Sequence, residues 1–202
     1  MGVSMDGKKV RFFIPLFVCG LLACVSAQAA VIEISAMLAY STSDFEDGYH
    51  SLQRRYTGTI DFKFTPVSAL EFEYTDSTTR ITFPTTLGGY IALPTRQVTN
   101  YKDQVYSFNW VQNLVSTKWI LQPYFVIGGG KMHRVVTVDL PEYRYSEKSS
   151  QNLTTGTGGL GVRLFMTKAM AVKAEAKTYV PEFRFSKWKE NQMLSLGLSW
   201  AF

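Results

Sequence analysis

The sequence predicts an all-β fold, an eight-stranded antiparallel up-and-down transmembrane β-barrel, and three observations indicate it. Apolar and polar side chains alternate residue by residue in eight separate segments, as in strands whose two faces meet different surroundings. The connections between these segments alternate between short and long. An export signal precedes the first segment, so the chain is delivered across a membrane.

The first 29 residues are predicted to be a cleaved signal peptide. Basic residues between Lys8 and Arg11 lead into an apolar run from Phe12 to Ala23, and Ala27-Gln28-Ala29 fits the small-x-small cleavage pattern. The apolar run is too short to span a bilayer as a helix. We therefore expect residues 30–202 to form a single barrel domain.

Both cysteines, Cys19 and Cys24, lie inside the predicted signal, so the mature chain has no thiol for a disulfide or a metal site. A loose lipobox at Leu21-Leu22-Ala23-Cys24 leaves open the alternative that Cys24 is retained as a lipidated N-terminus. Signal cleavage leaves 18 basic and 15 acidic side chains, a net charge of +3. This small excess argues against nucleic acid as a partner.

The first four segments show the alternation most clearly. Their apolar faces, taken at every second residue, are Ile32 to Tyr40, Tyr56 to Phe64, Leu70 to Tyr74 and Tyr106 to Trp110. The opposite faces carry charged or small polar side chains such as Glu33, Asp61, Glu71 and Ser107. A strand with one apolar and one polar face fits the wall of a barrel.

The last four segments repeat the pattern with more glycine. Their apolar faces include Trp119, Leu121, Phe125 and Ile127, then Leu160 to Met166, Val172 to Val180 and Leu194 to Phe202. The fifth segment, from Trp119 to about Val138, is the least regular and contains Gly128 to Gly130. No stretch shows a helical period of useful length, so the fold class is all-β.

The connections predict how the barrel is oriented. Short turns are expected near residues 65–69, 112–118 and 167–168, and longer loops near 41–55, 76–101, 139–151 and 181–190. Short turns at one end and long loops at the other are typical of bacterial outer-membrane barrels, whose turns lie in the periplasm.

Nine charged side chains share the polar face of the segments: Glu33, Asp61, Lys63, Glu71, Glu73, Arg163, Lys173, Glu175 and Lys177. A soluble sandwich would also bury one apolar face. However, Tyr40, Tyr106 and Trp200 fall near the ends of the apolar segments, where a membrane interface favours amphipathic rings. In the narrow lumen of an eight-stranded barrel, we expect these acids and bases to form an ion network that plugs the interior.

The final segment places five apolar side chains on one face: Leu194, Leu196, Leu198, Trp200 and Phe202. It looks like the C-terminal signal by which the barrel-assembly machinery recognises outer-membrane barrels. Together with the stretches from Gln122 to Gly130 and from Gly158 to Arg163, it makes the mature chain resemble the small porin-family outer-membrane β-barrels, the OmpA-type transmembrane domain and its single-domain relatives. The chain departs from the OmpA type because no periplasmic peptidoglycan-binding domain follows the barrel.

The resemblance implies a bacterial outer-membrane location, with outer-membrane lipids, lipopolysaccharide and the assembly machinery as partners. Basic residues of the predicted loops, including Arg80, Lys131, Arg134 and Lys148, are candidates for pairing with lipopolysaccharide phosphates. The predicted function is that of a monomeric, non-enzymatic barrel with a structural or surface-interaction role.

Two alternatives for the function remain open. One is a small-solute or ion channel of the porin class. The other is a lipid A-modifying enzyme that would use His133 beside Ser146, Ser149 or Ser150. The spacing from Gly156 to Gly161 formally matches a dinucleotide-binding motif, but a strand and not a helix is predicted after it. We therefore expect no cofactor, and we assign no catalytic or metal-binding residue.

Overall fold

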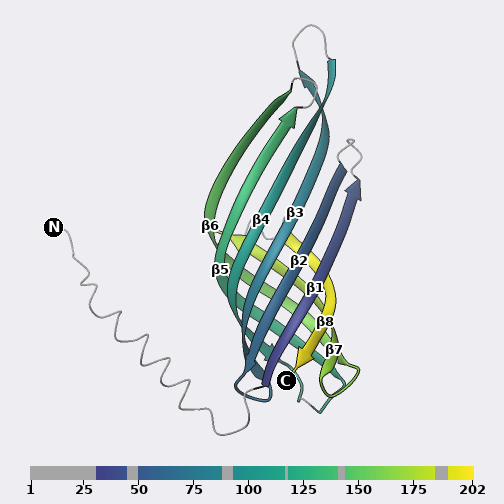
Figure 1. Cartoon of the computed structure of the whole chain (residues 1–202), viewed down its shortest axis with the longest axis vertical. Helices are drawn as coiled ribbons and strands as arrows, with labels where there is room; N and C mark the ends of the chain where they lie inside the picture. Colours follow the sequence, from purple (N-terminus) through teal and green to yellow (C-terminus); the bar gives the residue numbers. More distant parts are fainter. Residues whose placement is uncertain (1–30, 45–49, 88–92, 117, 141–143, 185–190) are drawn as a thin grey trace, which may run out of the picture. The chain divides into compact units, whose positions relative to one another are not determined.

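The computed structural model describes residues 31–44, 50–87, 93–116, 118–140, 144–184 and 191–202. They form a closed barrel of eight antiparallel strands in sequence order, which confirms the predicted fold (Figure 1). The strands are β1 Val31–Asp44, β2 His50–Lys63, β3 Ser68–Leu87, β4 Leu93–Asn113, β5 Leu121–Leu140, β6 Tyr145–Phe165, β7 Met170–Pro181 and β8 Gln192–Ala201. The predicted signal peptide lies outside the described residues, so its cleavage stays a prediction. Within the described ranges, no helix is long and apolar enough to cross a membrane.

The barrel closes between its first and last strands. β1 and β8 pair in a register that runs from Glu33 opposite Ala201 to Leu38 opposite Leu196. The Phe202 amide also donates to the Ile32 carbonyl at 2.8 Å, beyond the end of this ladder. Closure satisfies backbone groups that would have no hydrogen-bond partner in hydrocarbon.

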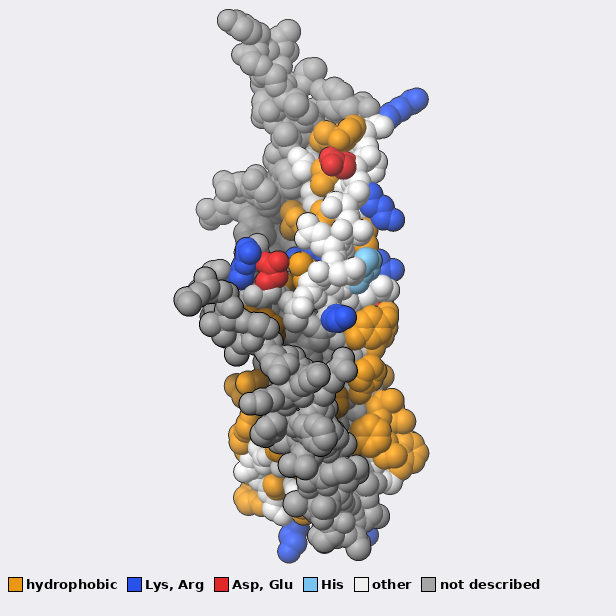
Figure 2. All heavy atoms as spheres, turned by 90° about the vertical axis from the view of Figure 1, so that its left-hand side faces the viewer, with side chains coloured by type: hydrophobic (Ala, Val, Ile, Leu, Met, Phe, Trp, Pro, Cys, Tyr) orange, Lys and Arg blue, Asp and Glu red, His pale blue; other side chains and the backbone are white. Residues whose placement is uncertain are grey.

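Side-chain exposure alternates along the strands as the sequence predicts. On β4, Phe108 is 57% exposed on the outer face, whereas its neighbour Ser107 is 2% exposed and faces the lumen. Leu160 on β6 and Leu196 on β8 are likewise 65% and 61% exposed. Figure 2 shows apolar side chains gathered on the lower half of one face, with lysine and arginine above them. Large exposed apolar side chains are what a lipid-facing surface requires.

Aromatic side chains mark both borders of the apolar band. Toward the long hairpins they are Tyr40, Tyr56, Tyr74 and Tyr106, and toward the short turns they are Trp110, Trp119, Trp200 and Phe202. The rings of Tyr74 and Tyr106 lie 5.0 Å apart on neighbouring strands. Rings with one polar atom suit the boundary between lipid and water.

The structure corrects three of the predicted long loops. β3 and β4 pair continuously out to Leu87 opposite Leu93, and β5 and β6 pair out to Leu140 opposite Tyr145. β1 and β2 also continue, to Asp44 opposite His50. Beyond the apolar band both faces of a strand meet water, so the contrast between the faces fades although the backbone ladder continues. The predicted loops 41–55, 76–101 and 139–151 are therefore mostly strand.

The four longest strands, β3 to β6, extend beyond the rest of the barrel as a sheet (Figure 1). β6 pairs with β7 only as far as Thr155 opposite Pro181. Between Tyr145 and Thr154, β6 is therefore an edge strand of the described part of the barrel. Every residue from Tyr145 to Asn152 is exposed.

Two short turns use a threonine in the same way. The Thr65 hydroxyl accepts a 2.8 Å hydrogen bond from the amide of Ser68, and the Thr167 hydroxyl accepts one of 2.9 Å from the amide of Met170. A side-chain oxygen thus takes an amide that the turn leaves free. The second turn spans residues 166–169, which is longer than the two residues predicted. Trp119 lies in the turn before β5 and not in the strand.

One residue of the predicted lipid face is covered by the protein itself. Val180 on β7 is only 7% exposed. Glu182 and Phe183 adopt positive φ angles of 54° and 55°, and the Phe183 amide donates to the Val180 carbonyl at 3.1 Å. The Phe183 ring would lie 3.1 Å from a Cβ added to Gly156, so this glycine leaves room for the ring. The chain after β7 therefore folds back over the outer wall.

Candidate functional site

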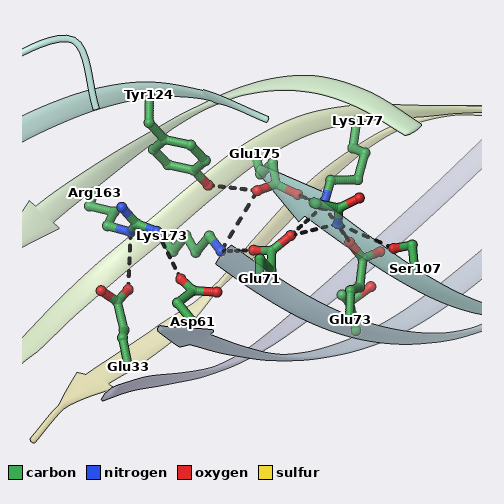
Figure 3. Close-up of polar contacts among 12 residues, drawn as sticks. Glu33, Asp61, Glu71, Glu73, Ser107, Tyr124, Arg163, Lys173, Glu175 and Lys177 are labelled. Carbon is green, nitrogen blue, oxygen red and sulfur yellow. Dashed lines mark hydrogen bonds and ion pairs between the residues drawn. The ribbon is translucent and has the colours of Figure 1, made fainter. Parts of the chain in front are cut away.

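The charged side chains predicted for the lumen all face the barrel interior. Eight of them are at most 4% exposed, and Lys63 is the exception, with 14% of its side chain exposed. They come from β1, β2, β3, β6 and β7, so the closed sheet brings together residues far apart in sequence. Figure 3, which labels all of them except Lys63, shows two adjoining groups.

The first group centres on Arg163 of β6. Its Nε lies 3.0 Å from Glu33 Oε1 and its Nη2 lies 3.0 Å from Asp61 Oδ2. The other Glu33 oxygen lies 2.6 Å from Lys63 Nζ. Arg163 also donates to Asn113 Oδ1 at 2.9 Å. The two acids and two bases balance, as a buried ion cluster requires.

The second group lies between β3 and β7. Lys177 Nζ is 2.5 Å from Glu73, 3.2 Å from Glu71 and 3.0 Å from Glu175. Lys173 Nζ is 3.2 Å from Glu71 and 3.7 Å from Glu175. Each ammonium group is thus shared by at least two carboxylates in the middle of the barrel.

Neutral residues that were not assigned to the predicted network complete it. Asn109 donates to Glu71 and to Glu73, at 2.9 Å in both cases. Tyr179 donates its phenol hydrogen to Glu73, and Thr75 donates to the same carboxylate at 2.9 Å. Strand parity places Asn109 and Tyr179 on the lumen face, but parity does not tell which carboxylate each one meets.

Glycines on the lumen face allow contacts between strands that are not neighbours. Tyr124 on β5 and Glu175 on β7 are both register partners of Gly161 on β6. The Tyr124 ring occupies the space that a Cβ on Gly161 would need, and its hydroxyl donates to Glu175 at 2.7 Å. In the same way, the Thr157 hydroxyl donates a hydrogen bond to Asn109 Oδ1 across Gly128, at 2.5 Å. The glycines of the middle strand therefore make room for side chains of the two flanking strands to reach each other.

A vestibule lies above this network, between the barrel and the protruding sheet. It has a volume of about 390 Å³, and Tyr179, Val105 and Met132 are among the residues that line it. Arg134 donates two 2.7 Å hydrogen bonds to the Asp103 carboxylate on its wall. Arg134 lies on β5, so the prediction that it is a loop residue is wrong.

Comparison with known proteins agrees with the barrel fold. The sequence from residue 16 to residue 202 matches the family described as outer membrane protein beta-barrel domain. The chain belongs to this family. No curated protein matches the sequence.

Solved structures with the same fold include three small barrels of outer-membrane proteins. The N-terminal barrel of Pseudomonas aeruginosa OprF is 16% identical, with a TM-score of 0.51 over 86% of this chain and 98% of that one. Yersinia pestis Ail, solved with the heparin analogue sucrose octasulfate, is 16% identical, with a TM-score of 0.52 over 87% and 100%. P. aeruginosa OprG is 13% identical, with a TM-score of 0.53 over 87% and 97%. At these identities the similarity shows the fold alone.

The outer wall of this outer-membrane barrel carries basic residues at the tyrosine border and just beyond it. Arg54, Lys102 and Lys131 are exposed on the outer face of β2, β4 and β5. The Arg54 guanidinium lies 6.0 Å from the centre of the Tyr40 ring, and Lys102 Nζ lies 3.8 Å from Asp76. The basic rim, as we call these three residues, thus lies at the border of the apolar band on the side of the long hairpins.

Two residues of the enzyme alternative, His133 and Ser146, have other partners in this outer-membrane barrel. His133 Nδ1 lies 2.7 Å from Asn152 Oδ1, and Ser146 donates to Asp139 at 2.6 Å. Gly156 to Gly161 lie within β6, which continues to Phe165, so no helix follows the glycine motif. In the part of the chain that the structure describes, no group of three or more His, Cys, Asp or Glu side chains is arranged to hold a metal.

Proposed function

We propose that this outer-membrane barrel is a closed membrane anchor that presents the protruding β3 to β6 sheet for interactions at the cell surface. The observation that carries the proposal is the combination of a filled lumen with strands that continue past the lipid band. β3 to β6 each have 20 or 21 residues, whereas β7 and β8 have 12 and 10. A tilted strand needs only about 9 to 11 residues to cross the bilayer.

The burial of the lumen charges supports a plug over a pore. A water-filled channel leaves its lining accessible to solvent. Here Asp61, Glu71 and Lys173 are 0% exposed and Arg163 is 1% exposed. Several ion pairs would have to break together before a solute passed, and each broken pair leaves a buried charge without its partner.

The protruding sheet supports the surface role. Its edge, from Tyr145 to Asn152 of β6, offers backbone groups and exposed polar side chains to a partner. Lysine and other polar residues on such an edge limit pairing with other barrels. The sheet is therefore suited to selective contacts outside the membrane.

The basic rim supports lipopolysaccharide as a partner at the base of the sheet. Arginine and lysine form strong charge-assisted hydrogen bonds to phosphate. Arg54, Lys102 and Lys131 are the residues that we assign to contacts with lipopolysaccharide. The heparin analogue in the Ail structure offers a suitable probe for the protruding sheet, whose exposed basic side chains include Arg80 and Lys148.

Planar-bilayer recording tests the closed lumen. The purified full-length mature barrel should insert without reproducible step currents, while a known porin in the same bilayer should give them. Reproducible steps from the barrel itself would favour the porin-class channel and end the plug proposal. Expression should also leave the mass of lipid A unchanged, and a new mass that a His133→Ala variant abolishes would favour the enzyme.

A trimmed variant tests the surface role. Joining Thr79 to Tyr101 and Val135 to Ser150 by short turns shortens both hairpins at register pairs of the structure. The trimmed barrel should keep its unheated gel migration, because the membrane-spanning ladder is untouched. Cells that carry it should lose the adhesion to heparin-coated surfaces that the full-length barrel confers. If the full-length barrel confers no adhesion, or if the trimmed variant keeps it, the protruding sheet has no such role.

A further inference from the structure

Arg55 is a buried cation at the floor of the vestibule. It lies on β2 in phase with Thr57 and Asp61, so its side chain faces the lumen, and it is 4% exposed. The sequence predicted this position to be the last residue of a loop. The structure instead places it where the ion network ends and the cavity of about 390 Å³ begins.

The contacts of Arg55 leave part of its guanidinium without a hydrogen-bond partner. Its Cζ lies 4.8 Å from the centre of the Tyr179 ring, which covers one face of the group. Its Nη2 donates to the Asn191 carbonyl over a long 3.5 Å, and its Nε has no hydrogen-bond partner among the described residues. Stacking on a ring satisfies the face of a guanidinium but not the N–H groups at its edge.

The other arginines inside the barrel differ from Arg55. Arg163 contacts two carboxylates, and Arg134 holds Asp103 with two hydrogen bonds. Within the described ranges, Arg55 forms no ion pair. Burying a cation without an anion costs folding free energy, so the position of Arg55 indicates that a negatively charged group is missing from the structure.

We propose that the vestibule binds a small carboxylate, whose oxyanion lies against the free edge of Arg55. A guanidinium edge matches a carboxylate with two parallel hydrogen bonds. The lining also contains Ile81, Val105 and Met132, which suit an apolar body attached to the carboxylate. The cavity volume of about 390 Å³ lies within the range of roughly 300 to 1,000 Å³ that is usual for small-molecule sites. This inference is independent of the partner of the protruding sheet.

Benzoate is the probe for this site, and benzamide is its uncharged counterpart of the same shape. The ¹⁵N-labelled mature barrel is folded in an uncharged detergent, and the arginine Nε–H resonances are followed during each titration. Benzoate should shift the Arg55 resonance in a saturable way, and benzamide should not. An Arg55→Gln variant should bind benzoate about tenfold more weakly or not at all. An Arg54→Gln variant, changed at the neighbouring residue on the outer wall, should bind it as the parent does.

Benzenesulfonate and phenyl phosphate identify the anion class. If either compound binds more tightly than benzoate, the ligand group of the site is a sulfonate or a phosphate and not a carboxylate. The proposal fails if none of these anions shifts the Arg55 resonance, if benzamide shifts it equally, or if Arg55→Gln binds like the parent. If Arg55→Gln does not fold, Arg55→Lys serves instead: it keeps the positive charge, and the arginine signal that it lacks is the Arg55 resonance. In that case, a saturable benzoate shift at Arg55 in the parent supports the site, and its absence overturns it.

Discussion

The Tyr124 hydroxyl on β5 donates a 2.7 Å hydrogen bond to Glu175 on β7, across Gly161 of the strand between them. An aromatic side chain thus spans a whole strand of the barrel wall from the inside. The tyrosine also lies under Arg163, whose Cζ is 4.5 Å from the ring centre. One side chain therefore links the two charge groups of the lumen.

This relationship makes Gly161 a sensitive position. A Gly161→Ala substitution should lower the free energy of unfolding by about 1 to 3 kcal/mol, because the added methyl group takes the space of the Tyr124 ring. Urea titration of the folded protein in lipid vesicles measures the change. Gly158→Ala is the matched control, since nothing lies within 4 Å of the added Cβ, and its effect should stay within about 0.5 kcal/mol. Equal effects would show that Tyr124 does not depend on the glycine.

The carboxylate of Glu71 should be essential to the second charge group. Glu71→Gln removes the charge that faces both Lys173 and Lys177 at 3.2 Å, and the loss should destabilise the barrel by roughly 3 to 5 kcal/mol. The partly exposed pair of Asp76 with Lys102 provides the control, since Asp76→Asn should change stability by about 0 to 1 kcal/mol. A Glu71→Gln variant as stable as Asp76→Asn would mean that the lumen charges are well solvated.

The loss of folding free energy caused by an arginine on the outer face should depend on its depth in the membrane. Phe108→Arg places a charge in the apolar band and should cost roughly 2 to 4 kcal/mol near the midplane. Thr78→Arg, on the exposed outer face of β3 beyond the tyrosine border, should cost about 0 to 1 kcal/mol. Folding titrations in lipid vesicles compare the two. If both are equally harmless, the assignment of Phe108 to the lipid face is wrong.

The proposed assembly signal can be separated from stability. Phe202 is 71% exposed and so is Leu194, so truncating either side chain should alter urea unfolding to a similar extent. If the terminal ring is recognised by the assembly machinery, Phe202→Ala should reduce the amount of barrel in the outer membrane of living cells well below that of Leu194→Ala. Equal amounts of the two variants in the membrane fraction would refute recognition of Phe202.

The barrel could be predicted from the sequence because each membrane-spanning segment has one apolar and one polar face. For example, the alternation of side chains along a strand is enough to assign Ser107 to the lumen and Phe108 to the lipid. The alternation fades beyond the lipid band, where both faces of a strand meet water. For this reason Arg55 and the far ends of β3 to β6 were assigned to loops. Parity also cannot choose partners within the lumen. That Tyr124 meets Glu175 follows from the register of three strands and from the space above Gly161, which only the closed barrel defines.

The seam between β1 and β8 joins the earliest and the latest strands of the chain, from Glu33 opposite Ala201 to Leu38 opposite Leu196. These strands cannot meet until β8 has been made and delivered, so closure has to follow translation and cannot proceed along with it. Until then β1 presents a bare row of amides and carbonyls on the side that later receives β8. Until β8 arrives, that row has to be kept from pairing with other strands, and the last strand of the barrel ends the exposure by covering it.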